Sequence, residues 1–269
     1  MQENIRKVGI TGAAGHIGST LVEALGGKYE LTLIDRQIIP PSIARGHKTL
    51  CTEIEHADEV KNIFDGLDAV IHLAGNRRAE GLWDSIHNNN IVGTYNVLEE
   101  CRRAGVKRVV FTSSNHVQHG HTIRTTPETL DTKFYSKGKL LTLSDPTQPD
   151  SIYAVSKVFG EELCKLYAKK YGIQIVSLRV GWTIPEDTPL AMKGTSAEDY
   201  LRAMFLSKRD CVQAFSRALE VPMKAGNYLV AYAISNNGRR VFDLTETRKT
   251  LGYNPQDDAE EFFKSPTKH

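Results

Sequence analysis

The fold class is decided by the stretch Lys7-Val8-Gly9-Ile10-Thr11-Gly12-Ala13-Ala14-Gly15-His16-Ile17-Gly18. A short apolar run leads into three glycines with the spacing GxxGxxG, and a segment of helical periodicity follows. A strand, a glycine turn and a helix N-terminus suit the diphosphate of a dinucleotide. The candidate contacts are Gly12, Gly15, His16, Ile17 and Gly18. A turn that binds nothing is the alternative, but the second apolar run, which ends at Asp35, favours the dinucleotide.

Outward from this stretch, short apolar runs alternate with longer segments of helical periodicity. The expected strands are Lys7 to Thr11, Glu30 to Asp35, Asp68 to Ala74, Lys107 to Ser113, Ile173 to Val180 and Asn227 to Ile234. The expected helices are His16 to Leu25, Ala57 to Phe64, Trp83 to Ala104, Ser151 to Tyr171, Asp199 to Leu206, Asp210 to Leu219 and Asp257 to Lys264. Right-handed crossovers make such strands parallel and cover both faces, so we predict an α/β, doubly wound parallel sheet of the Rossmann type.

Two interruptions divide the chain. After His116 a polar stretch with three prolines reaches Asp150, and we expect a long loop or lid there. After Val180 a second proline-rich stretch precedes the last helical segments. The predicted domains are residues 1–180, which bind the dinucleotide, and residues 181–269, a small substrate-covering lobe interleaved with the last strand and helix.

Composition excludes several classes of function. The 269 residues carry 34 basic and 32 acidic side chains mixed along the chain, so no basic stripe indicates nucleic acid or a membrane surface as partner. The four cysteines never form a CxxC pair, which argues against zinc and against a disulfide framework. No signal-peptide pattern and no apolar stretch of about 18 residues occurs. We expect a cytoplasmic protein with a small-molecule partner.

Asp35 stands at the end of the second predicted strand. A carboxylate at this place accepts hydrogen bonds from the adenosine ribose and repels a 2'-phosphate. Arg36 weakens that preference, because a guanidinium can stack on adenine or engage a phosphate. NAD is therefore the predicted cofactor, and NADP is the alternative.

Three further places are candidates for shaping the cofactor site. Leu73-Ala74-Gly75 ends a predicted strand, where small residues let backbone approach a ligand. Glu53 and Ile54 either flank the adenine or belong to a solvated loop. Asn90 lies near a glycine within a helical segment, and that glycine costs helix stability unless something packs closely against it.

Two pairs of residues have the spacing YxxxK, Tyr153 with Lys157 and Tyr135 with Lys139. Residues four apart share a helix face, and an ammonium group beside a phenol favours the phenolate, so such a tyrosine can act as a base. Tyr153 opens a long amphipathic segment, whereas Tyr135 lies among loop-like residues that would not hold its geometry. Tyr153 is therefore the predicted catalytic base and Lys157 its tuning residue. A core aromatic residue is the alternative for any single tyrosine.

Ser114 follows an apolar strand, at the edge where a parallel sheet places reactive groups, and we expect it to hold the substrate oxygen. Asn115 and His116 come next and are predicted substrate contacts, with structural loop residues as the alternative. The histidines His116, His119 and His121 have no acidic or cysteine partner at ligand spacing, so we expect no metal site.

Arginines near the expected site are candidates for binding an anionic substrate. Arg77 and Arg78 follow the strand that ends near Ala74, and Arg202 lies in the later lobe. A guanidinium binds carboxylate or phosphate through two hydrogen bonds, so Arg77 and Arg202 are the predicted contacts. A merely solvated arginine is the alternative for each.

With these residues in place, the chain resembles the extended short-chain dehydrogenase/reductases, the NAD-dependent epimerase/dehydratase family, over nearly its whole length. The matching features are the glycine loop, Asp35, Asn90, Ser114, Tyr153 and Lys157. Within the family it is most similar to uronate dehydrogenase and the archaeal NAD-dependent glucose-6-phosphate dehydrogenase. The segments that carry this likeness are Ser113 to His116, Tyr153 to Glu161, Arg179 to Gly181 and Phe205 to Asp210.

The chain departs from these relatives in two places. Residues 115–152 separate the serine from the tyrosine, which is more than the resemblance leads us to expect, so we interpret residues 118–150 as an insertion. Uronate dehydrogenases also place an arginine where this chain has Tyr200, with Arg202 only nearby. The loop of Arg77 and Arg78 can bind a phosphate instead.

The resemblance implies oxidation of an aldose, a sugar phosphate or a uronate at its anomeric carbon, with hydride transfer to NAD and a lactone as product. In that chemistry Tyr153 takes the hydroxyl proton, Ser114 holds the oxygen and Lys157 also binds the nicotinamide ribose. A homodimer formed through helices Trp83 to Ala104 and Ser151 to Tyr171 is implied as well. The alternatives are a nucleotide-sugar epimerase or dehydratase, and a dinucleotide-sensing protein without turnover.

Overall fold

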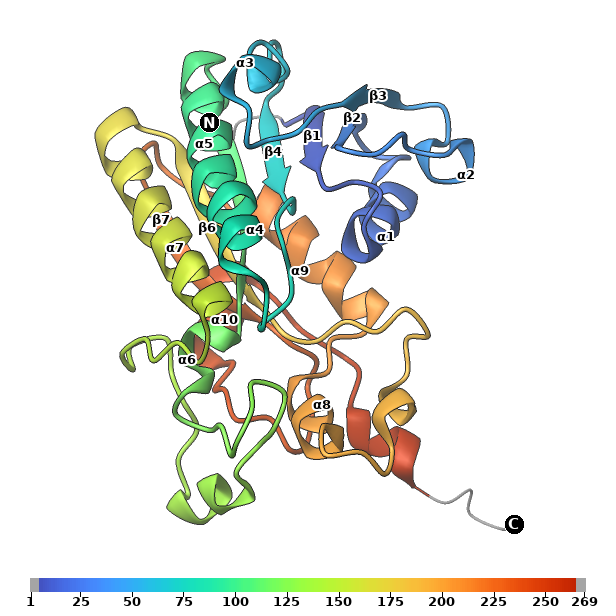
Figure 1. The fold of residues 1–269 in the computed structure, drawn as a ribbon, viewed down its shortest axis with the longest axis vertical. Helices are drawn as coiled ribbons and strands as arrows, with labels where there is room; N and C mark the ends of the chain where they lie inside the picture. Colours follow the sequence, from blue (N-terminus) through green and yellow to red (C-terminus); the bar gives the residue numbers. More distant parts are fainter. Residues whose placement is uncertain (1–4, 265–269) are drawn as a thin grey trace.

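The computed structural model describes residues 5–264 and has a sheet of seven parallel strands at its centre (Figure 1). The strands are β1 (Lys7–Thr11), β2 (Glu30–Asp35), β3 (Lys48–Cys51), β4 (Ala69–His72), β5 (Arg108–Ser114), β6 (Gln174–Val180) and β7 (Tyr228–Ala233). Their order is β3-β2-β1-β4-β5-β6-β7. The winding reverses between β1 and β4, so the loops that follow these strands diverge and leave a crevice at the carboxyl edge. The predicted doubly wound α/β fold is confirmed.

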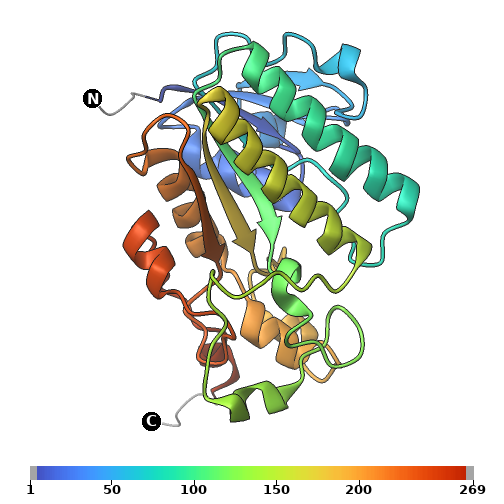
Figure 2. The ribbon, with the colours of Figure 1, turned by 90° about the vertical axis from the view of Figure 1, so that its left-hand side faces the viewer.

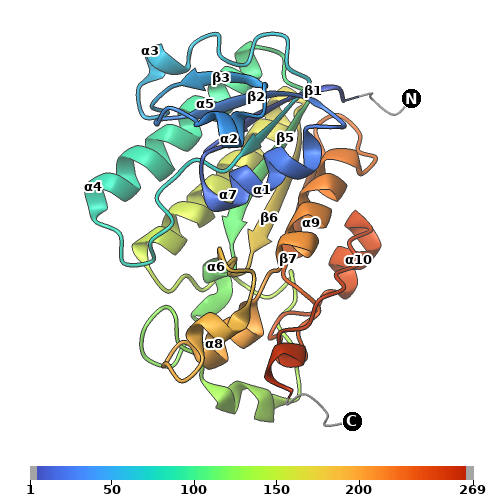
Figure 3. The same ribbon diagram turned by 90° about the vertical axis from the view of Figure 1, so that its right-hand side faces the viewer.

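Helices cover both faces of the sheet. The longer ones are α1 (His16–Leu25), α5 (Gly93–Arg103), α7 (Ile152–Tyr171), α8 (Glu198–Met204), α9 (Lys208–Glu220) and α10 (Thr245–Leu251). Helices α5 and α7 lie side by side on one face (Figure 2), and α1 and α9 lie on the other (Figure 3). Each layer buries apolar side chains against the strands, and the sheet is therefore hydrophobic on both faces.

Short elements occupy the connections. They are α2 (Pro41–Ala44), α3 (Ala57–Val60), α4 (Trp83–Ile86), the π-helix η1 (His87–Val92), α6 (His116–His119), and the 3-10 helices η2 (Thr132–Lys137), η3 (Pro189–Met192) and η4 (Ala259–Phe263). The predicted helix over Trp83 to Ala104 is thus three consecutive pieces, and the one over Ala57 to Phe64 ends at Val60. The edge strand β3 and helix α10 were not predicted. Most of β3 is exposed, so no apolar run marks it.

Helix α7 begins one residue after its predicted start and ends at the predicted residue, Tyr171. Ser151 is its N-cap, and the Ser151 hydroxyl accepts a hydrogen bond from the Ala154 amide at 3.2 Å. Gly172 ends it with φ 78°, a left-handed conformation that favours glycine. Gly160 lets α7 approach β5, since a Cβ there would lie 2.3 Å from the Phe111 ring. The helix is thereby held against the strand that ends at Ser114.

The insertion, residues 118–150, has little regular secondary structure, as expected of a long loop, but it packs closely against the rest of the molecule. The amide of Gln118 donates to the carbonyls of Thr142 and Asp145, and its oxygen accepts a hydrogen bond of 2.6 Å from the Tyr232 hydroxyl. Leu141 forms a parallel bridge with Phe242. Together with part of the C-terminal segment, the insertion forms a separate hydrophobic cluster below the sheet. The polar composition of the insertion gave no sign of this cluster.

The C-terminal third is divided between a helix that packs on the sheet and elements that lie beyond the carboxyl edge of the sheet. We expected α9 in the substrate-covering lobe, but it packs against the sheet beside α1, because Phe215 and Leu219 face the core. Helix α8, with η3 and η4, does lie beyond the carboxyl edge of the sheet, next to the insertion. No helix within residues 5–264 is both long and apolar enough to cross a membrane.

Candidate active site

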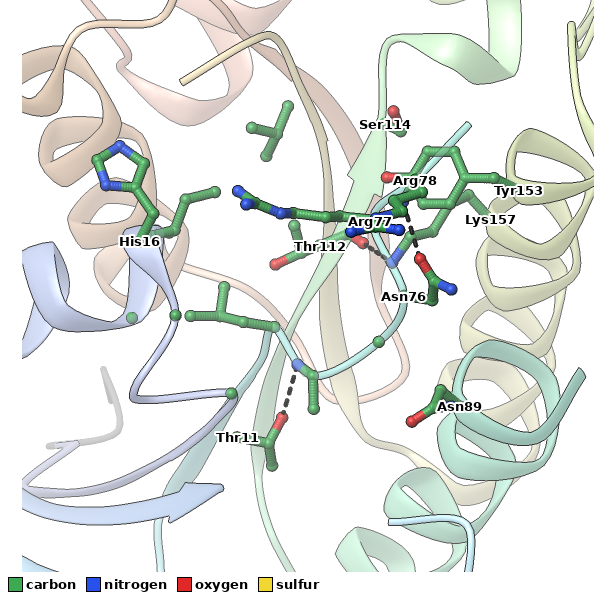
Figure 4. Close-up of a pocket in the computed structure, with 18 of the residues that line it drawn as sticks. Thr11, His16, Asn76, Arg77, Arg78, Asn89, Thr112, Ser114, Tyr153 and Lys157 are labelled. Carbon is green, nitrogen blue, oxygen red and sulfur yellow. Dashed lines mark hydrogen bonds between the residues drawn. The ribbon is translucent and has the colours of Figure 1, made fainter. Parts of the chain in front are cut away.

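A cleft of about 870 Å³ opens at the carboxyl ends of β1, β4, β5 and β6. Figure 4 shows His16 at one end of it and Ser114, Tyr153 and Lys157 at the other. The candidate residues that line the cleft are Gly12, Gly15, His16, Ile17, Gly18, Asp35, Arg36, Glu53, Ile54, Leu73, Ala74, Gly75, Arg77, Ser114, Asn115, His116, Tyr153 and Lys157. Asn90 and Arg202 lie outside its lining.

The backbone of the glycine loop packs too closely for side chains at Gly12 and Gly18. Gly12 has φ +74°, and a Cβ on Gly18 would lie 2.4 Å from the Gly12 carbonyl oxygen. Helix α1 starts after Gly15, and neither a side-chain cap nor an acidic residue occupies its first turn. Its free amide groups and the positive end of its dipole therefore face the cleft, where they fit the diphosphate of a dinucleotide.

Asp35 and its neighbours form the end of the cleft that lies away from Tyr153. One oxygen of the Asp35 carboxylate accepts a hydrogen bond from the Ala14 amide at 3.0 Å, and the other accepts one from the Gln37 amide at 3.2 Å. Arg36, Glu53 and Ile54 lie along the same wall. This wall combines a carboxylate for ribose hydroxyls with an apolar side chain for a base.

Asn90 lies outside the cleft and holds a loop that lines it. Its side-chain oxygen accepts a hydrogen bond of 2.7 Å from the Asn76 amide, and its nitrogen donates to the Asn76 carbonyl and to the Ser156 hydroxyl, both at 3.0 Å. The π-helix η1 carries this asparagine, which is buried. Asn90 therefore ties the loop after β4, including Gly75, to helix α7.

Tyr153 and Ser114 meet at the opposite end. Burial raises the pKa of the Tyr153 phenol, whereas its hydrogen bond with Ser114 lowers it. The carboxylate of Asp150 raises this pKa further, and the Arg77 guanidinium lowers it. A buried phenol that is hydrogen-bonded to a serine and open to a cleft is suited to exchange a proton with a bound hydroxyl group.

Lys157 lies one turn further along α7. Its ammonium group donates to the Thr112 carbonyl at 2.9 Å and lies over the Tyr153 ring, 5.7 Å from the centroid. Burial lowers the pKa of Lys157 to about 8. The sequence led us to expect that Lys157 lowers the pKa of Tyr153. In the structure, burial has the largest effect on that pKa, and it raises it. The Lys157 ammonium group is bound by the Thr112 carbonyl and lies over the Tyr153 ring.

A hydrogen-bonded chain of side chains forms the wall beside Tyr153. His116 lies 2.6 Å from the Asp150 carboxylate through Nδ1 and 3.0 Å from the Tyr200 hydroxyl through Nε2. The Asn115 amide donates to the same hydroxyl at 2.6 Å. The rings of His116 and Tyr153 meet edge to face, with 5.8 Å between their centroids. The chain fixes the orientation of Asn115 and His116, which both line the cleft.

The other two histidines of this region belong to the insertion and contact residues within it. His119 contacts the Thr122 hydroxyl at 2.6 Å and the Thr129 carbonyl at 3.0 Å, and His121 contacts the Pro146 carbonyl at 2.9 Å. Both ring nitrogens of His116 and of His119 therefore have protein partners.

The three candidate arginines have different surroundings. Arg202 forms ion pairs with Glu198 at 2.9 Å and with Glu260 at 2.5 Å, away from the cleft. Arg202 therefore does not lie in the substrate site, where we expected it. Arg77 and Arg78 extend between His16 and Tyr153 (Figure 4), and neither forms an ion pair with a carboxylate of residues 5–264.

Several lining residues had not been singled out from the sequence as site residues. They include Thr11, Asn76, Asn89, Thr112, Glu128, Trp182, Thr183 and Tyr200. Glu128 comes from the insertion and Tyr200 from α8, so both reach the cleft only through tertiary packing. Thr11 is the last residue of β1 and Thr112 lies two residues before the end of β5, and a position near a strand end is a signal that could have been used.

The comparisons with known proteins agree with this geometry. Residues 8–184 match the model of the NAD dependent epimerase/dehydratase family. The chain is similar to L-arabinose 1-dehydrogenase (NAD(P)(+)) of Haloferax volcanii, with 38% identity over 94% of this chain and 97% of that protein. It is also similar to the NAD-dependent glucose-6-phosphate dehydrogenase of the same organism, with 32% identity over 94% of each.

Among solved structures, it resembles a variant of uronate dehydrogenase from Agrobacterium tumefaciens in complex with NAD. The TM-score is 0.78 and the identity 27%, over 98% of this chain and 92% of that one. Together with the glycine loop, the carboxylate at Asp35 and the pair Tyr153 and Lys157, these matches show that the chain belongs to the NAD-dependent epimerase/dehydratase family.

Proposed function

We propose that this protein is an NAD-dependent sugar dehydrogenase that oxidises a free sugar at its anomeric carbon and releases a lactone. The observation that carries the proposal is the meeting of the Tyr153 and Ser114 hydroxyls at one end of a cleft whose other end suits a dinucleotide. The names of the relatives point to the same reaction class: two are sugar dehydrogenases that use NAD or NAD(P).

In the proposed reaction the Tyr153 phenolate accepts the proton of the anomeric hydroxyl, and the Ser114 hydroxyl donates a hydrogen bond to the sugar oxygen. The positive charge of Arg77 favours the phenolate, and so does the Ser114 hydroxyl until it turns its single donor proton to the sugar oxygen. Lys157 binds the ribose next to the nicotinamide. Bound NAD supplies the acceptor for the hydride. Residues 1–180 are proposed to bind the cofactor and parts of residues 181–269 to cover the sugar, which excludes water from the transfer.

One screen tests this function. Free aldoses, uronic acids and sugar phosphates are incubated with NAD or NADP, and the absorbance of the reduced cofactor is followed. We expect one equivalent of reduced cofactor for each sugar oxidised, and a lactone as product. Conversion of a nucleotide sugar without net reduction of NAD would instead establish the epimerase alternative, and binding of NAD without turnover of any sugar would establish the sensing protein.

For the nucleotide we propose NAD ahead of NADP. The Asp35 carboxylate lies against the Ala14 amide, at the place where a 2'-phosphate would approach. Arg36 lies beside it in the lining and leaves some room for NADP. An Asp35→Ala substitution should narrow the ratio of kcat/KM for NAD to that for NADP, and an unchanged ratio would count against this role of Asp35.

We also propose a homodimer in which a second copy of this chain covers helix α7. Ile152, Val155, Phe159 and Leu166 follow one another at helical spacing and are all exposed, and Tyr95 of the neighbouring α5 is exposed as well. A stripe of this kind on a single chain is a frequent sign of an interface. Light scattering should give the mass of two chains, and Phe159→Arg should give one; a monomeric native protein would refute the proposal.

A cytoplasmic location is proposed on the basis of the cysteines. Cys51, Cys101, Cys164 and Cys211 are all free thiols, and three of them are buried. Free thiols are typical of a reducing compartment.

A further inference from the structure

The insertion delivers a carboxylate to the sugar end of the cleft, at Glu128. The Thr129 hydroxyl accepts hydrogen bonds from the amides of Thr125 and Thr126 and donates one to the Thr126 carbonyl. The Thr129 carbonyl in turn contacts the His119 ring at 3.0 Å. The turn that carries Glu128 is therefore fixed from two sides.

The Glu128 side chain is half-buried and lines the cleft, yet it forms no hydrogen bond or ion pair with any residue of the described range 5–264. The neighbouring carboxylates behave differently. Asp145 accepts hydrogen bonds from Thr142, Asp131 accepts one from the Lys133 amide, and Asp150 contacts His116. A partly desolvated carboxylate without donors is unfavourable unless a ligand supplies them.

Charge is distributed unevenly along the cleft. At the sugar end, the carboxylates of Asp150 and Glu128 both raise the pKa of Tyr200, in addition to the larger effect of burial. At the cofactor end, Lys208 and Arg77 help burial to lower the pKa of His16, beside the N-terminus of α1. Two carboxylates thus act on Tyr200, whereas the charges near His16 are mixed, since Asp187 and Glu186 oppose Lys208 and Arg77 there. Arg77 acts on Tyr153 as well as on His16.

The Tyr200 hydroxyl has hydrogen-bonding partners in Asn115 and His116. The Asn115 amide donates to the Tyr200 oxygen, and the Tyr200 hydroxyl can donate to His116 Nε2 while His116 Nδ1 donates to Asp150. All of these bonds can be made with a neutral imidazole. No arginine or lysine side chain of residues 5–264 belongs to this chain of hydrogen bonds. The wall offers partners for hydroxyl groups and no counter-ion for an anion.

We propose that Glu128 is a substrate-specificity residue, which accepts hydrogen bonds from hydroxyl groups of an uncharged aldose and excludes aldoses that carry a carboxylate or a phosphate. This inference rests on the proposed sugar dehydrogenase function. A carboxylate has only acceptors, so it matches hydroxyl donors with charge-assisted hydrogen bonds and repels a second anion. It requires that Arg77 and Arg78, which both line the cleft and form no ion pair within residues 5–264, serve the cofactor and not the substrate.

The test compares sugars that differ at one carbon. The values of kcat/KM are measured for D-galactose against D-galacturonate and for D-glucose against D-glucose 6-phosphate, with L-arabinose and D-xylose as further neutral sugars. The variants are Glu128→Gln and Glu128→Lys. Glu30→Gln, an exposed glutamate at the amino end of β2, removes the same charge away from the cleft and is the control. The KM for NAD is measured for each protein, because Glu128 should not affect it.

We expect the native protein to prefer the neutral member of each pair by at least about tenfold. Glu128→Gln should lower kcat/KM for neutral aldoses about tenfold, as expected for a lost charge-assisted hydrogen bond, and should narrow the preference, while Glu128→Lys should narrow it further. Glu30→Gln should change neither value.

Two results would overturn the inference while the proposed function stands: efficient oxidation of a uronate or sugar phosphate by the native protein, or a ratio that Glu128→Gln leaves unchanged. If no free sugar of either class reduces the cofactor, the proposed function itself fails and the inference falls with it.

Discussion

The segments of Tyr153 and Tyr135 share the spacing of a tyrosine and a lysine and differ in their surroundings. Tyr153 and Lys157 lie on the 20-residue helix α7 and are both buried at the cleft. Tyr135 lies in the 3-10 helix η2, which ends at Gly138, and its hydroxyl donates to the Arg239 carbonyl. Lys139 follows this helix and is 74% exposed, 3.7 Å from Asp145. The spacing therefore produces a shared, buried face only where a long helix surrounds it.

The largest expected difference between the segments concerns the two hydroxyl groups. Tyr153→Phe should lower kcat of the sugar oxidation by about 10³-fold, because the proposed base is removed. Tyr135→Phe should change kcat less than twofold and should instead lower the free energy of unfolding by about 1 kcal/mol, because the hydrogen bond to the Arg239 carbonyl is lost. Steady-state kinetics and urea unfolding of both variants measure this. Full activity of Tyr153→Phe would eliminate the proposed base.

The lysines sharpen the same comparison at a smaller scale. Lys157→Met should lower kcat about 10²-fold, since the ammonium group that faces the Tyr153 ring and is proposed to hold the cofactor ribose is lost. Lys139→Met should leave kcat and the KM for NAD unchanged, because Lys139 is exposed and far from the lining of the cleft. If both substitutions lowered kcat equally, the buried position of Lys157 would not matter for catalysis.

A glycine near each pair tests the packing. Gly160→Ala places a Cβ 2.3 Å from Phe111, so α7 must move away from β5; we expect a loss of about 1 to 3 kcal/mol in unfolding free energy and a lower kcat. Gly138→Ala meets no atom within 4 Å but has φ +62°, so about 1 kcal/mol should be lost with no change in kcat. A Gly160→Ala protein of native activity would mean that the position of α7 is not critical.

The smallest effect is a dependence of stability on pH. Lys157 has a folded-state pKa of about 8, lowered by burial from 10.5. Between these values the unfolded chain binds the proton that the folded chain has released, so this group increases stability as the pH rises from about 8 to 10.5. The unfolding free energy of the native protein minus that of Lys157→Met should therefore grow over this interval, as measured by urea unfolding at several pH values. A constant difference would mean that burial does not lower this pKa.

Much of the fold could be predicted from local signals. The bounds of α1 and β2 are those expected, since apolar periodicity and the glycine turn act within a few residues. The edge strand β3 was missed because its side chains are mostly exposed, and α9 was assigned to the lobe because periodicity shows which face is apolar but not what covers it. The insertion looked like a loop because its apolar residues are spaced irregularly and gather only in the folded chain.

The candidate site divides in the same way. By itself the sequence determined the glycine loop, Asp35 and the strand-end serine, because backbone conformation and position at a sheet edge depend on neighbouring residues. Only the tertiary structure decided that Arg202 pairs with Glu198 and Glu260, that Asn90 braces the loop after β4, and that Glu128 reaches the cleft. It also placed Tyr153, which the sequence context had already favoured over Tyr135, in a buried position at the cleft. These outcomes depend on contacts between distant segments, and burial, charge and hydrogen bonding at such contacts are properties of the packed chain.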